Sequence, residues 1–114
     1  MVTKNNTIIG SGRHNCIISA NNLLIQSSSI SHIKFIDSNV RISSNTEVEN
    51  CEFENSTVSL VGEHCISIKS CNFNKSPLKY ETAISGCFIV DNIFDYPFVK
   101  FIGGNNVIKD NIIK

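Results

Sequence analysis

The sequence contains few of the residues that favour helices. Only two alanines, four leucines, one methionine and one glutamine occur among its 114 residues, and tryptophan is absent. These residue types, tryptophan aside, are among the strongest helix formers, so their scarcity argues against an all-helical or α/β protein. In their place stand 18 isoleucines, 15 asparagines and 15 serines. β-Branched residues favour strands, and asparagine and serine favour turns. The composition therefore predicts an all-β fold.

The sequence also lacks an excess of charge of either sign. Ten basic residues balance ten acidic ones, and charged residues make up 18% of the chain, below the roughly 25% of an average domain. A neutral chain without a basic block predicts no nucleic-acid partner and no anionic membrane partner. No apolar run has the length of a signal peptide or a membrane-spanning helix. The composition leaves the cellular location open.

Cysteine pairs with metal-site or disulfide spacing are missing as well. The chain has five cysteines, an odd number, and no CxxC pair, which argues against a closed disulfide framework and a standard zinc site. We expect free, buried cysteines that act as small apolar residues, a state compatible with the cytoplasm. We expect no metal and no cofactor. The five are Cys16, Cys51, Cys65, Cys71 and Cys87.

Internal repetition is the strongest positive feature. Written in rows of about 20 residues, within the range of solenoid repeats, the sequence shows an apolar column and, two positions earlier, a mostly small or polar column. Repeats of this length are too short for a propeller blade or a helical hairpin. They predict a single domain over residues 1–114, a parallel β-solenoid of about five to six coils. The apolar column contains Ile33, Phe53, Phe73, Ile93 and Ile113, and the earlier column contains Ser31, Cys51, Cys71, Asp91 and Asn111.

A solenoid of this kind stacks equivalent residues on successive coils, because each strand pairs in parallel with the strand one coil below. We therefore expect Ile33, Phe53, Phe73 and Ile93 to form one inward stack. Cys51 and Cys71 should point inward as well, since residues two apart share a face of a strand. Outside the core, Glu49 and Lys69 should lie on adjacent coils within reach of each other.

One six-residue segment recurs in a form that identifies a possible family. VENCEF (Val48 to Phe53) returns as IKSCNF (Ile68 to Phe73), IVDNIF (Ile89 to Phe94) and IKDNII (Ile108 to Ile113). This pattern resembles the right-handed parallel β-helix repeat of pectin-lyase-like proteins. Two other solenoids remain open: the left-handed β-helix of hexapeptide-repeat proteins, from an apolar residue at every sixth position, and the pentapeptide-repeat coil, from every fifth.

Three aspartates are the candidate catalytic residues that the resemblance to polysaccharide-cleaving β-helices brings forward. Asp91, Asp95 and Asp110 could stack on neighbouring coils near Lys109, and glycoside hydrolysis needs two carboxyl groups roughly 5–10 Å apart. The competing interpretation is that Asp91 and Asp110 occupy bends and bind backbone amides.

Two further groups of residues are possible sites. Four acidic residues lie within eight positions, as in a metal-binding or sugar-binding patch, but a solvated outer strand is the favoured interpretation. A histidine acts as general base in hexapeptide acyltransferases, but none of the three histidines has a local context that favours this role. The acidic residues are Glu47, Glu49, Glu52 and Glu54, and the histidines are His14, His32 and His64.

These features favour a non-enzymatic structural or binding module with a carbohydrate as the expected ligand class. The alternatives are a carbohydrate-active enzyme (a polysaccharide lyase or glycoside hydrolase, or a fragment of one) and, less favoured, a hexapeptide-type acyltransferase. Because the repeat pattern continues to Ile112 and Ile113 without a polar cap, we expect a homo-oligomer that forms through the terminal coils. The alternative is that the chain is part of a longer solenoid.

Overall fold

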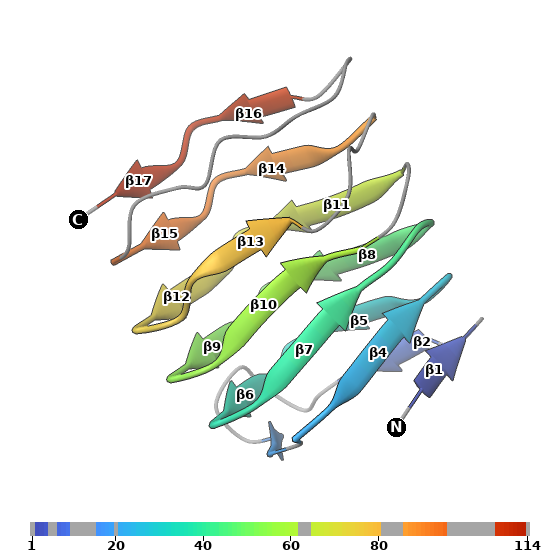
Figure 1. Cartoon of the computed structure of the whole chain (residues 1–114). Helices are drawn as coiled ribbons and strands as arrows, with labels where there is room; N and C mark the ends of the chain where they lie inside the picture. Colours follow the sequence, from blue (N-terminus) through green and yellow to red (C-terminus); the bar gives the residue numbers. More distant parts are fainter. Residues whose placement is uncertain are drawn as a thin grey trace.

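The chain folds as a parallel β-solenoid with three sheets. The computed structural model describes residues 2–4, 7–9, 16–19, 21–61, 65–80, 86–95 and 107–113, and these residues contain strands, turns and bends but no helix. All neighbouring strands pair in parallel (Figure 1). The predicted all-β solenoid class is confirmed.

Up to β15, each sheet consists of every third strand along the chain, and β16 and β17 then continue sheets B and C. Sheet A contains β1 (Val2–Lys4), β4 (Leu23–Gln26), β7 (Asn39–Ile42), β10 (Thr57–Leu60) and β13 (Leu78–Tyr80). Sheet B contains β2 (Thr7–Ile9), β5 (Ser29–Ser31), β8 (Thr46–Glu49), β11 (Ile66–Lys69), β14 (Phe88–Val90) and β16 (Val107–Lys109). Sheet C contains β3 (Ile17–Ile18), β6 (Lys34–Ile36), β9 (Glu52–Glu54), β12 (Asn72–Asn74), β15 (Ile93–Phe94) and β17 (Ile112–Ile113).

The coils vary in length around the 20-residue spacing of the sequence rows. Strands β4 to β15 make four complete coils of three strands. β1–β3 add one strand to each sheet below them, and β16 and β17 add one strand each to sheets B and C above, so the described stack has about four full turns with further strands at both ends, a count that differs slightly from the predicted five to six coils. Partner residues are 17 positions apart between β3 and β6, 20 between β9 and β12, and 22 between β2 and β5. This variation fits neither a strict six-residue nor a strict five-residue register.

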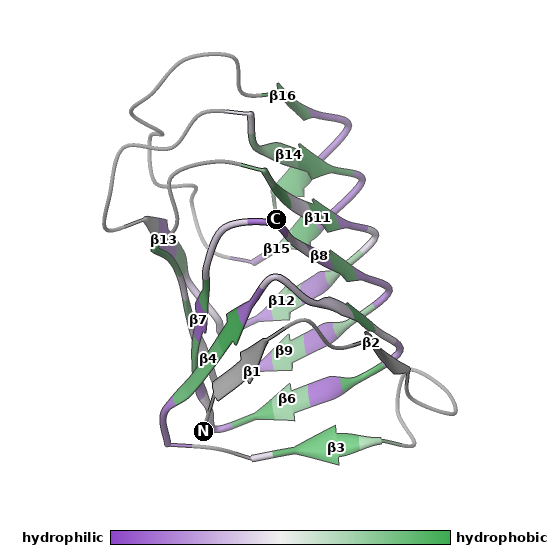
Figure 2. Cartoon of the chain, turned by 90° about the vertical axis from the view of Figure 1, so that its right-hand side faces the viewer, coloured by the Kyte–Doolittle hydropathy of each residue, from purple (hydrophilic) through white to green (hydrophobic). Residues whose placement is uncertain are grey.

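A residue in the left-handed backbone conformation stands at each described corner between strands. Twelve of the described residues have positive φ, between 49° and 72°, and one of these twelve is a glycine. Asparagine and aspartate accept this conformation more readily than most residues, which explains the polar corners of the repeat (Figure 2). The residues are Ser27, Asn45, Cys65 and Gly86 between sheets A and B; His32, Asn50, Ser70, Asp91 and Asp110 between B and C; and Asp37, Asn55 and Lys75 between C and A.

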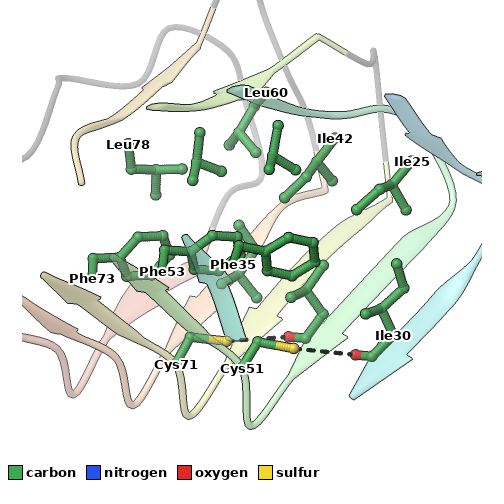
Figure 3. Close-up of a cluster of buried hydrophobic side chains, with 14 of the residues drawn as sticks. Ile25, Ile30, Phe35, Ile42, Cys51, Phe53, Leu60, Cys71, Phe73 and Leu78 are labelled. Carbon is green, nitrogen blue, oxygen red and sulfur yellow. Dashed lines mark hydrogen bonds between the residues drawn. The ribbon is translucent and has the colours of Figure 1, made fainter. Parts of the chain in front are cut away.

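Four stacked phenylalanines form the centre of the core on the side of sheet C, and Figure 3 shows Phe35, Phe53 and Phe73 among them. The rings of Phe35, Phe53, Phe73 and Phe94 follow one another with centroid distances of 4.9, 4.9 and 4.5 Å and are nearly parallel. Isoleucine, valine and leucine side chains of sheet A pack opposite them. These rings are fully buried, and they account for much of the apolar area that drives folding.

The predicted inward stack is therefore right at its centre and wrong at its two ends. Phe53 and Phe73 share a column, but Phe35 replaces Ile33 below them and Phe94 replaces Ile93 above. The reason is coil length: relative to the coil that joins Phe53 to Phe73, the coil below is shorter and the coil above is longer. Ile33 is still buried, in the column of Cys51 and Cys71, whereas Ile93 lies half-buried on the outer face of sheet C.

Polar side chains inside the corner between sheets B and C form a continuous ladder. The thiols of Cys51 and Cys71, both buried as predicted, donate to carbonyl oxygens of the coil below. The Asn92 Oδ1 atom accepts a hydrogen bond from the backbone amide of Cys71 (2.9 Å), and Asn111 Oδ1 accepts one from the backbone amide of Asn92 (2.9 Å). The ladder provides hydrogen-bond partners for backbone groups at the bend, which are not paired within a sheet.

Candidate binding surface

Two of the three candidate aspartates serve as corner residues. Asp91 and Asp110 have φ values of 57° and 56° and occupy the same corner column as Asn50 and Ser70, which lie on the two coils below Asp91. The Asp91 amide donates to the Lys109 carbonyl oxygen of the next coil at 3.3 Å. The structure thus brings Asp91, Asp110 and Lys109 together, as expected, but it gives the aspartates the left-handed conformation that the bend requires.

The third candidate, Asp95, lies at the other end of β15 from Asp91. Its carboxylate accepts two hydrogen bonds from the Lys75 amide, at 2.8 and 2.9 Å. Lys75 is a corner residue with a φ of 49°, so Asp95 satisfies the backbone of the corner one coil below. The three aspartates consequently do not converge on one point of the surface.

The acidic run divides at the Asn50 corner. Glu47 and Glu49 are exposed on the outer face of β8, whereas Glu52 and Glu54 lie on the outer face of β9, in a different sheet.

The two glutamates of β9 have defined partners. Glu52 is buried and its Oε1 atom accepts from Asn74 Nδ2 at 3.1 Å. Glu54 forms an ion pair with Lys34, with 3.4 Å between Oε2 and Nζ. Within the described part of the chain no three acidic, histidine or cysteine side chains are grouped to hold a metal ion.

Of the three histidines, the structure describes His32. His32 occupies a corner with a φ of 59°, the position that Asn50 takes one coil above. His14 and His64 lie outside the described residues.

Glu49 and Lys69 lie on adjacent coils, as predicted. They are register partners in β8 and β11, and both are exposed.

A small pocket of about 190 Å³ opens at the corner between sheets A and B. It is lined by Glu47, Cys65, Ile66, Ser67, Gly86 and Phe88. Cys65 is exposed, which departs from the expectation of buried cysteines, because it occupies a corner position with a φ of 60°. Next to this corner, burial raises the pKa of the Cys87 thiol from 9.0 to about 12, since a buried thiolate is poorly solvated.

The outer face of sheet A differs in charge from the other two faces. Arg41, Ser59 and Lys79 are successive register partners on β7, β10 and β13. Ser59 is buried between them although it faces outward. The outward strand positions described on β4, β7, β10 and β13 include no carboxylate; they are Leu24, Gln26, Asn39, Arg41, Thr57, Ser59 and Lys79.

Sequence reasoning missed this face. Arg41 and Lys79 are joined through Ser59 by two coils of unequal length, so rows of constant length place them in different columns. Alignment of Val40, Val58 and Leu78, the buried residues that precede them, would have revealed the row.

Comparison with protein-family models, curated proteins and solved structures finds no match to this chain. Among the described residues, none forms a helix with the length and apolar character needed to cross a membrane.

Proposed function

We propose that the chain is a non-enzymatic structural or binding module, a short β-helix whose sheet A binds an acidic carbohydrate. The observation that carries this proposal is the outer face of sheet A. It combines two cations with amide and hydroxyl side chains, and its described strand positions lack carboxylates. Cations bind carboxylate or sulfate groups, while amides and hydroxyls hydrogen-bond to sugar hydroxyls.

The geometry of the row fits an extended ligand. Arg41 and Lys79 lie two coils apart, about 10 Å at the spacing of parallel strands, with Ser59 between them. A linear polymer that runs along the solenoid axis would meet one such position on each coil. Its negative charges would be attracted to this face, whereas the exposed glutamates of β8 would repel them from sheet B.

The roles of the acidic residues also support binding rather than cleavage. Asp91 and Asp110 form corners, Asp95 accepts hydrogen bonds from a backbone amide, and Glu54 pairs with Lys34. Each of these residues has a task in the fold. Hydrolysis of a glycoside would need two carboxyl groups that face the same bond.

The test is a glycan array with neutral and acidic oligosaccharides, combined with a cleavage assay on the same ligands. We expect binding of acidic glycans that weakens with salt and no product formation. Arg41→Ser and Lys79→Ser should each weaken binding about fivefold, as expected for an exposed ion pair of about 1 kcal/mol. Lys69→Ser removes an exposed cation from sheet B and should leave binding unchanged.

Several outcomes would contradict the proposal. Binding that is equally sensitive to Lys69→Ser would indicate nonspecific attraction, and no binding of any acidic glycan would exclude the ligand class. Product formation that is abolished by Asp91→Asn or Asp110→Asn would replace the binding module with the carbohydrate-active enzyme.

A right-handed coil of the pectin-lyase-like type belongs to the same proposal. In Figure 1 the strands of sheet A cross the front from left to right, and the chain returns behind them through sheets B and C as the stack rises. This path supports a right-handed coil. The variable coil length supports the same assignment, since hexapeptide and pentapeptide repeats usually keep their spacing. A crystal structure with the opposite hand would exclude it.

A further inference from the structure

The last coil of the solenoid leaves core positions exposed. Ile113 and Ile108 occupy the inward columns of sheets C and B, yet 52% and 43% of their surfaces are exposed. Their register partners one coil below, Phe94 and Ile89, are 1% and 0% exposed. This difference in exposure corresponds to the side-chain surface that one more coil would cover. Ile112, on the outer face beside them, is 55% exposed.

The first strand of sheet C, β3, repeats the two isoleucines of β17, with the first on the outer face and the second facing the core. Ile17 of β3 is on the outer face and is 57% exposed, and Ile18 faces the core and packs against it while half-buried. The register of sheet C places Ile17 at the start of the outward column that ends at Ile112. Ile18 likewise starts the inward column that ends at Ile113.

Sheet B repeats this correspondence at the level of the backbone register. Ile8 of β2 pairs with Ile30, and the same column ends at Ile108. Among the described strands, β2 and β16 are the end strands of sheet B and β3 and β17 those of sheet C. Sheets B and C therefore each present an isoleucine position in the same column at both of their ends.

From this correspondence we infer that a second copy of the chain stacks head to tail on the first, with β2 and β3 of one copy against β16 and β17 of the other. Ile17 of the second copy then lies beside Ile112, and Ile18 beside Ile113. The direction follows from the strands, because every pair in the three sheets is parallel and only a head-to-tail copy continues that pairing. Two copies that meet through their C-terminal coils would reverse the strand direction across the contact.

The contact has two physical sources of affinity. An end strand exposes backbone N–H and C=O groups that a further strand can pair, and the isoleucines lose their exposed surface to each other. Because the two contacting surfaces are different, each added copy presents a new free end. The association is therefore open-ended and lengthens the solenoid with concentration. It requires no carbohydrate and is independent of the proposed binding face.

Two substitutions at opposite ends test the inference. Ile112→Lys places a charge in the contact at the C-terminal coil, and Ile17→Lys places one at the N-terminal coil. Both side chains are more than half exposed, so the fold should tolerate them. In sedimentation velocity over a wide concentration range, we expect the unaltered chain to form a series of dimers and larger species, and each variant alone to lose them.

An equimolar mixture of the two variants distinguishes head-to-tail from symmetric association. The intact C-terminal coil of the Ile17→Lys chain can receive the intact N-terminal coil of the Ile112→Lys chain, so the mixture should regain dimers and stop there. Glu47→Lys, at an exposed position on β8 in the middle of sheet B, is the matched control and should keep the full series. Ile17→Ser and Ile112→Ser repeat the experiment should a lysine variant fail to give the circular dichroism spectrum of the folded chain.

Three results would overturn the inference. The first is an unaltered chain that stays monomeric at all concentrations. The second is a closed dimer that survives Ile17→Lys and disappears with Ile112→Lys, because that pattern belongs to contact between two C-terminal coils. The third is a mixture of variants that contains monomers only.

Discussion

Replacement of Phe53 by alanine should cause one of the largest losses of stability among single core substitutions. Phe53 is completely buried and its ring stacks on Phe35 below and Phe73 above, each at a centroid distance of 4.9 Å. Truncation of a buried phenylalanine typically costs about 3–5 kcal/mol. Loss of two stacked pairs, each contributing about 0.5–1.5 kcal/mol beyond burial, places Phe53→Ala at the upper end of that range.

A loss of about 4–5 kcal/mol is a large part of the stability of a small domain, which is about 5–15 kcal/mol. Equilibrium unfolding in urea measures it as a lower transition midpoint with an unchanged slope. Phe94→Ala removes a ring that stacks, among the described phenylalanines, on Phe73, and it should cost less than Phe53→Ala. Phe53→Leu should recover part of the loss because it leaves a smaller cavity.

Ile93 provides the decisive comparison, because coils of constant length place it in the core and the structure places Phe94 there. Ile93 lies half-buried on the outer face, so Ile93→Ala should cost about 1 kcal/mol or less. An Ile93→Ala loss equal to that of Phe94→Ala would refute the register of sheet C. A Phe53→Ala loss below about 1 kcal/mol, far less than truncation of a buried ring costs, would refute the stacked core itself.

Three further predictions concern the corners and the surface. Lys69→Glu should destabilise the fold by no more than about 1 kcal/mol, because Lys69 and Glu49 are exposed register partners. Salt should reduce this loss. Urea unfolding at two salt concentrations measures the effect, and a loss that does not depend on salt would contradict the prediction. Asn92→Ala should cost roughly 2–4 kcal/mol in the same assay, because the fully buried side chain of Asn92 binds backbone groups, including the backbone amide of Cys71 at 2.9 Å. A loss below about 1 kcal/mol would show that the ladder is dispensable. Alkaline pH should weaken the fold through Cys87, whose pKa is about 12 in the folded chain against 9.0 without burial. The protonated thiol stabilises the folded state fully below pH 9, and the contribution is lost as pH rises towards 12, by about 1.4 kcal/mol per pH unit. Thermal unfolding between about pH 8 and 11 should show this slope in the unaltered chain and a smaller one in Cys87→Ala, and equal slopes would contradict the assignment.

The sequence alone predicted the class of fold, because two of its determinants are local. The scarcity of helix formers and the alternation of apolar and polar residues specify strands, and polar residues between them specify corners. The repeats VENCEF, IKSCNF, IVDNIF and IKDNII also carry the register of sheets B and C correctly: their first and last residues stack in the structure. Cys51 and Cys71 point inward for the same local reason, two positions before a buried phenylalanine.

The tertiary structure decided where each coil closes, and with it which surface residues meet. Coils of unequal length satisfy the same parallel pairing, because each turn can gain or lose residues while the strands keep their spacing; local sequence therefore does not set coil length. That freedom moved Phe35 and Phe94 into the column expected for Ile33 and Ile93. It also separated Asp95 from Asp91 and aligned Arg41 with Lys79, which are distant in the sequence. A surface formed across coils depends on the sum of all coil lengths between its residues, and only the folded stack fixes that sum.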